Sequence, residues 1–309
     1  MKKVSIYESS SLYRDRFCIQ GYVFGEGKKS LCVIGNMRGN EYQQLYIASQ
    51  LVQALKEAEE KNLLVPGYEI LVIPSANPSS INIEKRFWPI DNTDINRMFP
   101  GYMEGETTQR IAGGIFEKVK DYEYGIQFAS NYMTGHFMPY ISVMKTGLKY
   151  TEDAKKFGMP YVVLRNPRPY DTTTLNYNWQ IWDTKAFSLY TTMTEEIDKN
   201  SAIRGVQSVF RFMEKIGIMK YDYPEEKSSE VIDDEMILSI RATQAGIFEP
   251  AVEVEQKVKK GDLLAKILNP VDGEILTRLY APQDGVIFFL HSGPLIYDHT
   301  AVIKMIPQS

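Results

Sequence analysis

Two segments of the sequence carry side chains whose type and spacing could do chemistry. In residues 35–41, on a turn between a strand-like and a helix-like run, Arg38 precedes Glu41 by three positions, a spacing that permits an ion pair across one helical turn. The second segment, residues 75–101, has no clear period, and loops of that length inside a compact domain are usually functional. Its candidate binding residues are Arg86, Asn96 and Arg97.

Imidazole, on which much hydrolytic and metal chemistry depends, is scarce. The 309 residues contain only His136, His291 and His299. Cys18 and Cys32 stand alone rather than in a CxxC pair, which argues against a zinc ribbon or a disulfide framework and favours a reducing cytoplasm. The chain also has no glycine-rich phosphate loop with a lysine and no Gly-x-Ser-x-Gly elbow.

The overall charge limits the partners. A net charge of −4 and a pI near 5.6 argue against a protein that mainly binds nucleic acid or anionic lipid. No apolar run approaches the roughly 18 to 20 residues that span a bilayer, and two lysines near the start precede no apolar stretch. We expect a cytoplasmic protein without a nucleic-acid or membrane partner.

The elements that must position these side chains alternate between strand-like and helix-like runs over the first two thirds of the chain. Strands are expected at 31–35, 68–74, 125–128, 139–144, 161–164 and 186–190, and helices at 41–61, 105–120 and 201–216. This order predicts an α/β domain, residues 1–220, with a mixed or largely parallel sheet flanked by helices. A polar linker is expected at 221–230, and short strands punctuated by glycine then predict a smaller all-β domain, residues 228–309.

A string of motifs resembles the succinylglutamate desuccinylase/aspartoacylase family of the zinc carboxypeptidase superfamily. The motifs are Gly35-Asn36-Met37-Arg38-Gly39-Asn40-Glu41, Asn77-Pro78, Arg86, Asp94-Ile95-Asn96-Arg97-Met98-Phe99-Pro100-Gly101, and the C-terminal segments 258–262 and 281–286. The resemblance covers most of the chain and implies a carboxypeptidase-like fold. It also implies zinc-dependent hydrolysis of N-acyl amino acids, with zinc held by His-x-x-Glu and a second histidine, and with a glutamate as general base.

Three of the positions that this chemistry requires carry other residues. Glu41 keeps the carboxylate ligand position, but Arg38 stands at the first histidine, and a protonated guanidinium has no lone pair for a metal. Ala129 stands at the second histidine and Tyr190 at the catalytic glutamate. None of the histidines begins a His-x-x-Glu pair. The alternatives left open are a displaced ligand at His136 and a shifted base at Glu195 or Glu196.

The resemblance implies that Arg86, Asn96 and Arg97 bind substrate carboxylates and polarise the scissile carbonyl, a role that suits the arginine fork. The alternative is that the two arginines only pair with Asp91 or Asp94 to stiffen the loop. Arg38 is a further candidate for binding the anionic ligand, and the alternative is an ion pair with Glu41 that fills the vacated metal position. Three arginines against Glu41 would leave about two positive charges facing the cavity.

Two functions remain. The first is a degenerate family member that binds a small anionic ligand, a dicarboxylate or acyl amino acid, in a sensing, scaffolding or regulatory role, with no cofactor. A homo-oligomer or an active paralogue is a further partner that this role allows. The second is an active amide or ester hydrolase that uses Glu41, Tyr190 or a relocated glutamate. Zinc would be the cofactor if the assignment of the ligand positions were wrong.

Overall fold

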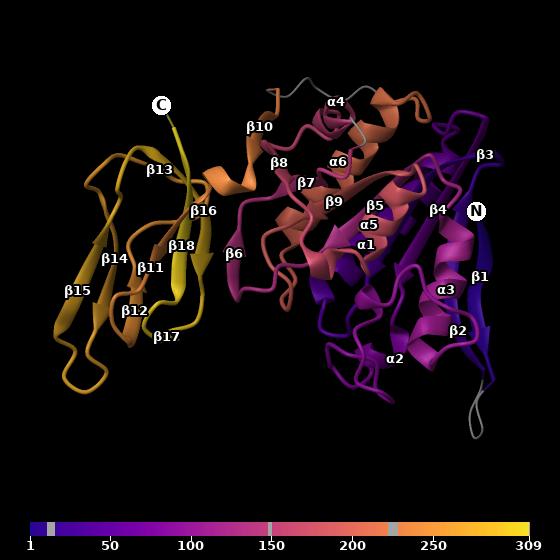
Figure 1. Cartoon of the computed structure of the whole chain (residues 1–309). Coiled ribbons are helices and arrows are strands. Elements are labelled where there is room, and N and C mark those ends of the chain that lie inside the picture. The colour runs from indigo at the N-terminus through magenta and orange to yellow at the C-terminus, as the bar shows by residue number, and fades with distance from the viewer. Residues whose placement is uncertain (11–15, 148–149, 222–227, 309) are drawn as a thin grey trace. The chain divides into compact units, whose positions relative to one another are not determined.

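The chain folds into two compact units in the computed structural model, which describes residues 1–10, 16–147, 150–221 and 228–308 (Figure 1). The first unit comprises residues 1–130 and 140–231, and the second comprises 131–139 and 232–309. The polar linker expected at 221–230 falls largely on residues 222–227, outside the described residues.

The first unit is built on a nine-stranded mixed sheet in the order β1-β2-β4-β3-β5-β9-β7-β8-β10. Its strands are β1 (Lys2–Ser9), β2 (Phe17–Phe24), β3 (Gly27–Asn36), β4 (Gly67–Ser75), β5 (Tyr124–Ala129), β7 (Tyr140–Met144), β8 (Tyr161–Arg165), β9 (Lys185–Tyr190) and β10 (Glu230–Asp233). The central run β4-β3-β5-β9 is parallel. Because β4, β3, β5 and β9 run in one direction, their carboxyl ends meet at one edge, where open α/β sheets bind their ligands.

Helices cover both faces of this sheet. They are α1 (Tyr42–Glu60), α2 (Pro78–Ile81), α3 (Thr107–Val119), α4 (Thr151–Lys155), α5 (Leu175–Ile181) and α6 (Lys199–Lys215), with 3₁₀ turns at Ile95–Arg97 and Pro169–Asp171. The helices α1 and α6 pack together over one face, and α3 and α5 contribute to the core on the other.

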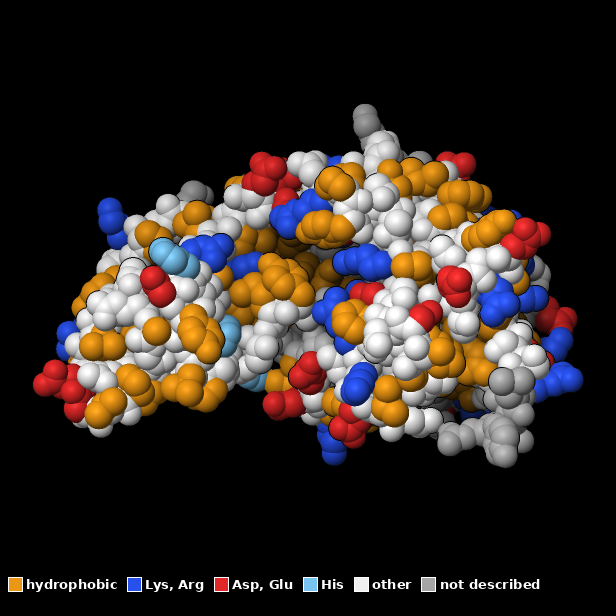
Figure 2. Space-filling model, turned by 60° about the horizontal axis from the view of Figure 1, so that its bottom comes forward, with side chains coloured by type: hydrophobic (Ala, Val, Ile, Leu, Met, Phe, Trp, Pro, Cys, Tyr) orange, Lys and Arg blue, Asp and Glu red, His pale blue; other side chains and the backbone are white. Residues whose placement is uncertain are grey.

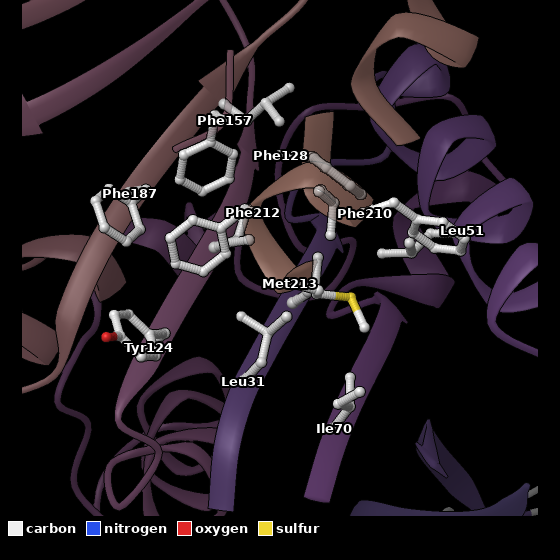
Figure 3. Close-up of a cluster of buried hydrophobic side chains, with 14 of the residues drawn as sticks. Leu31, Leu51, Ile70, Tyr124, Phe128, Phe157, Phe187, Phe210, Phe212 and Met213 are labelled. Carbon is white, nitrogen blue, oxygen red and sulfur yellow. The ribbon is translucent and has the colours of Figure 1, made fainter. Parts of the chain in front are cut away.

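The central strand β3 shows why its sequence is an unbroken apolar run. Leu31 and Val33 belong to the core beneath α1 and α6, whereas Cys32 and Ile34 belong to the core on the opposite face. Successive side chains of a strand point to opposite faces, so a strand covered on both sides is apolar throughout. Figure 3 shows the first core, where Phe157 and Phe212 stack with ring centroids 4.2 Å apart.

The second unit consists of two antiparallel sheets around its own apolar core. Its strands are β6 (Gly135–Phe137), β11 (Leu238–Arg241), β12 (Gly246–Pro250), β13 (Lys257–Val258), β14 (Leu263–Leu268), β15 (Ile275–Tyr280), β16 (Gly285–His291), β17 (Leu295–Ile296) and β18 (Ala301–Pro307), and a 3₁₀ turn lies at Asp234–Met236. The short strand β6 comes from the middle of the chain and pairs with β16.

The expected fold class, a mixed α/β sheet flanked by helices with further β structure at the C-terminal end, is confirmed. Each expected strand and helix of the first unit is present with small changes at its ends. The sequence did not predict β1, β2, β6 and β10. None of the helices in the described part of the chain is both long and apolar enough to cross a membrane.

Candidate functional site

The turn after β3 places Arg38 and Glu41 at the carboxyl edge of the parallel strands. The side-chain amide of Asn36 donates to the backbone carbonyl of Arg38, and Ser75 Oγ donates to Asn36 Oδ1 at 2.7 Å. The turn is therefore fixed to the end of β4 as well as to β3. A Cβ atom on Gly39 would lie 2.2 Å from the carbonyl oxygen of Ser80, so glycine is required where this turn meets the long loop.

Glu41 is a buried carboxylate whose hydrogen-bonding capacity is filled. Its Oε2 accepts from the backbone N–H of Met37 at 2.7 Å and of Arg38 at 3.1 Å. Its Oε1 accepts from Arg38 Nη1 at 2.9 Å and from Ser130 Oγ at 2.5 Å. Two carboxylate oxygens offer about four lone-pair sites, so this arrangement leaves Glu41 little capacity to bind a metal or to take up a proton as a general base.

Arg38 lies between two carboxylates. Its Nη1 is 2.9 Å from Glu41 Oε1, and its Nε is 3.0 Å from Asp94 Oδ2. The three side chains are only 10%, 2% and 9% exposed. Burial alone would lower the pKa of Arg38, but Glu41 and Asp94 outweigh it and raise that pKa above its ordinary value. The guanidinium therefore keeps its charge, and the ion pair with Glu41 that the spacing permits is formed.

Asp94 and Asn96 organise the end of the long loop. Asp94 Oδ1 accepts from the backbone N–H of Asn96 at 3.1 Å, while its Oδ2 accepts from Arg38. Asn96 Oδ1 in turn accepts from the backbone N–H of Leu175, the first residue of α5, at 3.1 Å. The polar residues Asp94 and Asn96 thus join the Arg38 turn, the loop and α5. The amide of Asn96 supports the backbone here, a use that the sequence did not predict.

The two other arginines flank this network differently. Arg86 Nη2 is 3.5 Å from Asp94 Oδ2 and its side chain is 41% exposed, so the pairing that would stiffen the loop is present for Arg86. Arg97 forms no ion pair with Asp91 or Asp94 within the described residues. Its Nη1 donates to the carbonyl of Asn96 at 3.1 Å, and its guanidinium lies over the ring of Tyr170.

The arginines repel one another. Burial, followed by the charge of Arg38, lowers the pKa of Arg97, and the charge of Arg86 acts in the same direction, against Asp94 and Asp171. Because Asp94 belongs to the cluster, the expected excess of about two positive charges is too large. Arg38, Arg86 and Arg97 against Glu41 and Asp94 leave one formal positive charge.

Ala129 and Tyr190 end the neighbouring strands β5 and β9 and are partners in the parallel register. Ala129 is buried, and its methyl group offers no ligand atom. The ring of Tyr190 stacks on that of Tyr140, with centroids 4.6 Å apart and planes 2° apart. Burial raises the pKa of Tyr190, although Arg165 and Arg38 oppose that change. A tyrosine that stays protonated at neutral pH is a hydrogen-bond donor rather than a base.

Several residues of this network were not singled out by their sequence. Ser130 Oγ accepts a hydrogen bond from Arg38 and donates one to Glu41. Arg165 donates two hydrogen bonds, of 2.7 and 3.1 Å, to the carboxylate of Asp171. Burial would raise the pKa of Asp171, but the hydrogen bonds from Arg165 and from the backbone of Arg168 lower it overall. Ser130 and Arg165 follow the predicted strands 125–128 and 161–164 closely, and this position in the sequence could have indicated that they lie near the site.

The residues that could carry relocated chemistry lie in different parts of the chain. His136 lies in β6 opposite Leu290 of β16, within the second unit, as do the other two histidines. The histidine side chains visible in Figure 2, in pale blue, lie on this unit. Glu195 is exposed, and its Oε1 accepts from Asn40 at 2.6 Å; Glu196 is exposed as well.

The residues present do not fit a zinc ion. Catalytic zinc takes three protein ligands from neutral imidazole, thiolate and carboxylate. At the two predicted histidine-ligand positions stand the charged Arg38 guanidinium, 2.9 Å from Glu41, and Ala129, and neither side chain offers a lone pair to a metal. Among the described residues, no three His, Cys, Asp or Glu side chains are grouped so that they could hold a metal.

A mixed sheet covered by helices, with a polar cluster at the carboxyl ends of its parallel strands and an attached β unit, defines a carboxypeptidase-like protein. The model of the succinylglutamate desuccinylase/aspartoacylase catalytic domain matches residues 27–215. The chain therefore belongs to the succinylglutamate desuccinylase/aspartoacylase family, whose members normally depend on zinc.

Individual relatives agree with this assignment. The chain is 24% identical over 284 residues to N-alpha-acetyl-L-2,4-diaminobutyric acid deacetylase of Halomonas elongata, a match covering 85% of this chain and 77% of that protein. A succinylglutamate desuccinylase from Silicibacter sp. TM1040 has a TM-score of 0.77 at 19% identity, covering 97% of this chain and 92% of the other. The product-bound ectoine utilization protein EutE (DoeB) of Ruegeria pomeroyi has a TM-score of 0.73 at 20% identity, covering 96% and 92%.

Proposed function

We propose that this chain is a family member that binds a small carboxylate ligand and does not carry out zinc-dependent hydrolysis. The observation that carries the proposal is the buried Arg38 guanidinium held between Glu41 and Asp94, at the position of a metal ligand. A permanent cation there supplies positive charge without a metal. It also occupies the carboxylate that a zinc ion would need.

The retained arginines support the binding half of the proposal. Arg86 and Arg97 keep donor groups that form no hydrogen bond with any described residue, and Arg97 is held in place by Tyr170. The mutual repulsion of Arg38, Arg86 and Arg97 is offset only in part by Glu41 and Asp94, and an anion between the guanidiniums would relieve it.

The relatives indicate the size of the ligand. The Halomonas elongata protein is, by its name, a deacetylase of an N-acetylated amino acid. A site of the same descent that keeps its arginines is suited to small dicarboxylates and N-acyl amino acids. Loss of the metal position, of its second ligand and of the base should together abolish hydrolysis, because each alone lowers the rate by orders of magnitude.

Thermal stabilisation of chelator-washed protein by dicarboxylates and N-acyl amino acids tests this function. We expect a rise in Tm for the wild type and none for Arg97→Ala, with Arg110→Met as the control because Arg110 is exposed on α3. Equal stabilisation of wild type and Arg97→Ala would contradict the binding site. Release of free amine from N-acyl amino acids should remain at background with or without added zinc, and zinc-stimulated release would favour the active hydrolase instead.

A further inference from the structure

The end of β9 presents a phenol hydroxyl that has no hydrogen-bond partner among the described residues. Tyr190 is paired in register with Ala129, and paired residues of parallel strands point to the same face, so Ala129 places only a methyl group beside the tyrosine. The stack on Tyr140 fixes the orientation of that ring. Tyr190 is partly exposed, and its hydroxyl forms no hydrogen bond with any residue that the structure describes.

Arg38 presents a second donor. Its Nε donates to Asp94, and its Nη1 donates to Glu41 and, at 3.3 Å, to Ser130 Oγ. Its Nη2 has no hydrogen-bond partner within the described part of the chain. Ser130 directly follows Ala129, the register partner of Tyr190, so the end of β5 links Arg38 to the tyrosine. The charges of Arg165 and then of Arg38 both oppose the rise that burial causes in the pKa of Tyr190.

The acceptor groups of Glu41, Ser130 and Asp94 already accept hydrogen bonds from protein donors. Glu41 accepts four hydrogen bonds from protein groups, and Ser130 Oγ accepts from Arg38 while it donates to Glu41. Asp94 already accepts from Arg38, from Arg86 and from the backbone of Asn96. The groups that remain open to a ligand at the Arg38–Tyr190 end are therefore the Nη2 group of Arg38, which can only donate, and the phenol of Tyr190, which can donate or accept.

We propose that the Arg38–Tyr190 end of the site holds the ionised carboxylate of a small dicarboxylate and discriminates against an amide at the same position. This inference rests on the proposed function and narrows it, because it selects free dicarboxylates from the ligands considered there. A carboxylate accepts at both oxygens and suits a guanidinium and a phenol together. A neutral primary amide lacks the negative charge that strengthens hydrogen bonds from the guanidinium and the phenol, and its N–H₂ group cannot accept from Arg38.

Isothermal titration with matched probes tests the inference. The probes are succinate and succinamate, glutarate and glutaramate, and inorganic phosphate, each titrated into wild type, Tyr190→Phe and the control Tyr297→Phe, whose side chain is 83% exposed in the second unit. Tyr190→Phe removes one hydroxyl that makes no hydrogen bond with the described protein, so the fold should keep its stability. Arg38→Met combined with Glu41→Gln serves as a second variant, because it removes the guanidinium without leaving a buried charge at position 41, while Asp94 keeps Arg86 and the backbone N–H of Asn96.

For the wild type and for Tyr297→Phe, we expect the dicarboxylate to bind at least about tenfold more tightly than its mono-amide. In Tyr190→Phe and in the double variant this ratio should shrink toward one. A wild-type ratio within about twofold of one, a ratio unchanged in Tyr190→Phe, or tighter binding of phosphate than of either dicarboxylate would each overturn the inference. If N-acyl amino acids bind while the ratio is near one, only this inference fails. If no carboxylate binds, the proposed function fails with it.

Discussion

Breaking the ion pair between Arg38 and Glu41 should lower the free energy of unfolding far more than breaking a surface pair. The losses from changing the two residues should not be additive. Arg38→Met would leave the Glu41 carboxylate, whose side chain is 2% exposed, without a counter-charge, and would leave Asp94 paired with only the more distant Arg86 among the described residues. Removing one partner of a buried pair costs about 3–5 kcal/mol. Because Glu41 would keep its bonds from two backbone N–H groups and from Ser130, we expect the lower end of that range, about 3 kcal/mol.

The double variant should lower the free energy of unfolding by less than the sum of the losses in the two single variants. In Arg38→Met combined with Glu41→Gln, the new amide can donate to Ser130 Oγ and accept from the backbone N–H groups of the turn, so no buried charge is left at position 41. Each single variant should cost about 3 kcal/mol, and the double variant should cost about 3 rather than the additive value of about 6, which corresponds to a coupling free energy of about 3 kcal/mol.

Urea unfolding followed by tryptophan fluorescence measures these free energies in the appropriate unit, since Trp88, Trp179 and Trp182 all lie in the first unit. The matched control is Lys155→Met with Glu152→Gln, an exposed pair with the same spacing and a 2.7 Å contact, whose coupling should stay below about 0.5 kcal/mol. Additive losses for Arg38 and Glu41 would refute the view that the two charges depend on each other.

Three further predictions concern the same unit. Arg38→His with Ala129→His should bind zinc at micromolar or tighter affinity, measured by competition with a chromophoric chelator, because two imidazoles and Glu41 would complete a three-ligand set; no gain would contradict the assignment of these positions. The lowered pKa of Asp171 means that its ionised form stabilises the fold above the ordinary value of about 3.9, and that this contribution is lost as the pH falls through the lower folded value. Asp171→Asn should therefore flatten the acid limb of a plot of unfolding free energy against pH, and an unchanged slope would count against the role of this carboxylate. Gly39→Ala would place a Cβ atom 2.2 Å from a backbone carbonyl oxygen, so it should lower the unfolding free energy by about 1–3 kcal/mol and weaken ligand-induced stabilisation; a fully stable variant would show that the loop can yield.

Most of the first unit could be predicted because its buried elements have strong local patterns. The apolar run of β3 and the helical spacing along α1 are properties of neighbouring residues. The strand β1 was not predicted because, as an edge strand, most of its side chains are only partly buried or exposed. The strand β6 spans three residues and pairs with β16, about 150 positions later in the chain, so its local sequence contains little information about that pairing.

In the site too, contacts between residues near in sequence were predictable and contacts between distant residues were not. The ion pair of Arg38 with Glu41 follows from a spacing of three residues, and it is formed. The contact of Arg38 with Asp94 joins residues 56 positions apart, and that of Glu41 with Ser130 joins residues 89 apart, so both depend on how the strands are ordered. Without Asp94 in the count, the charge of the cluster was overestimated. The roles of Arg86, Asn96 and Arg97 toward a ligand stay predictions.

The central claim is that Arg38 has replaced the metal, and the metal content of the protein tests it most directly. Purified chain, incubated with excess zinc and then freed of unbound metal by gel filtration, should contain far less than one zinc per chain by elemental analysis. Arg38→His with Ala129→His, treated in parallel, should approach one zinc per chain. Stoichiometric zinc in the wild type would contradict the claim, because the charged Arg38 guanidinium and a zinc ion cannot occupy the same carboxylate.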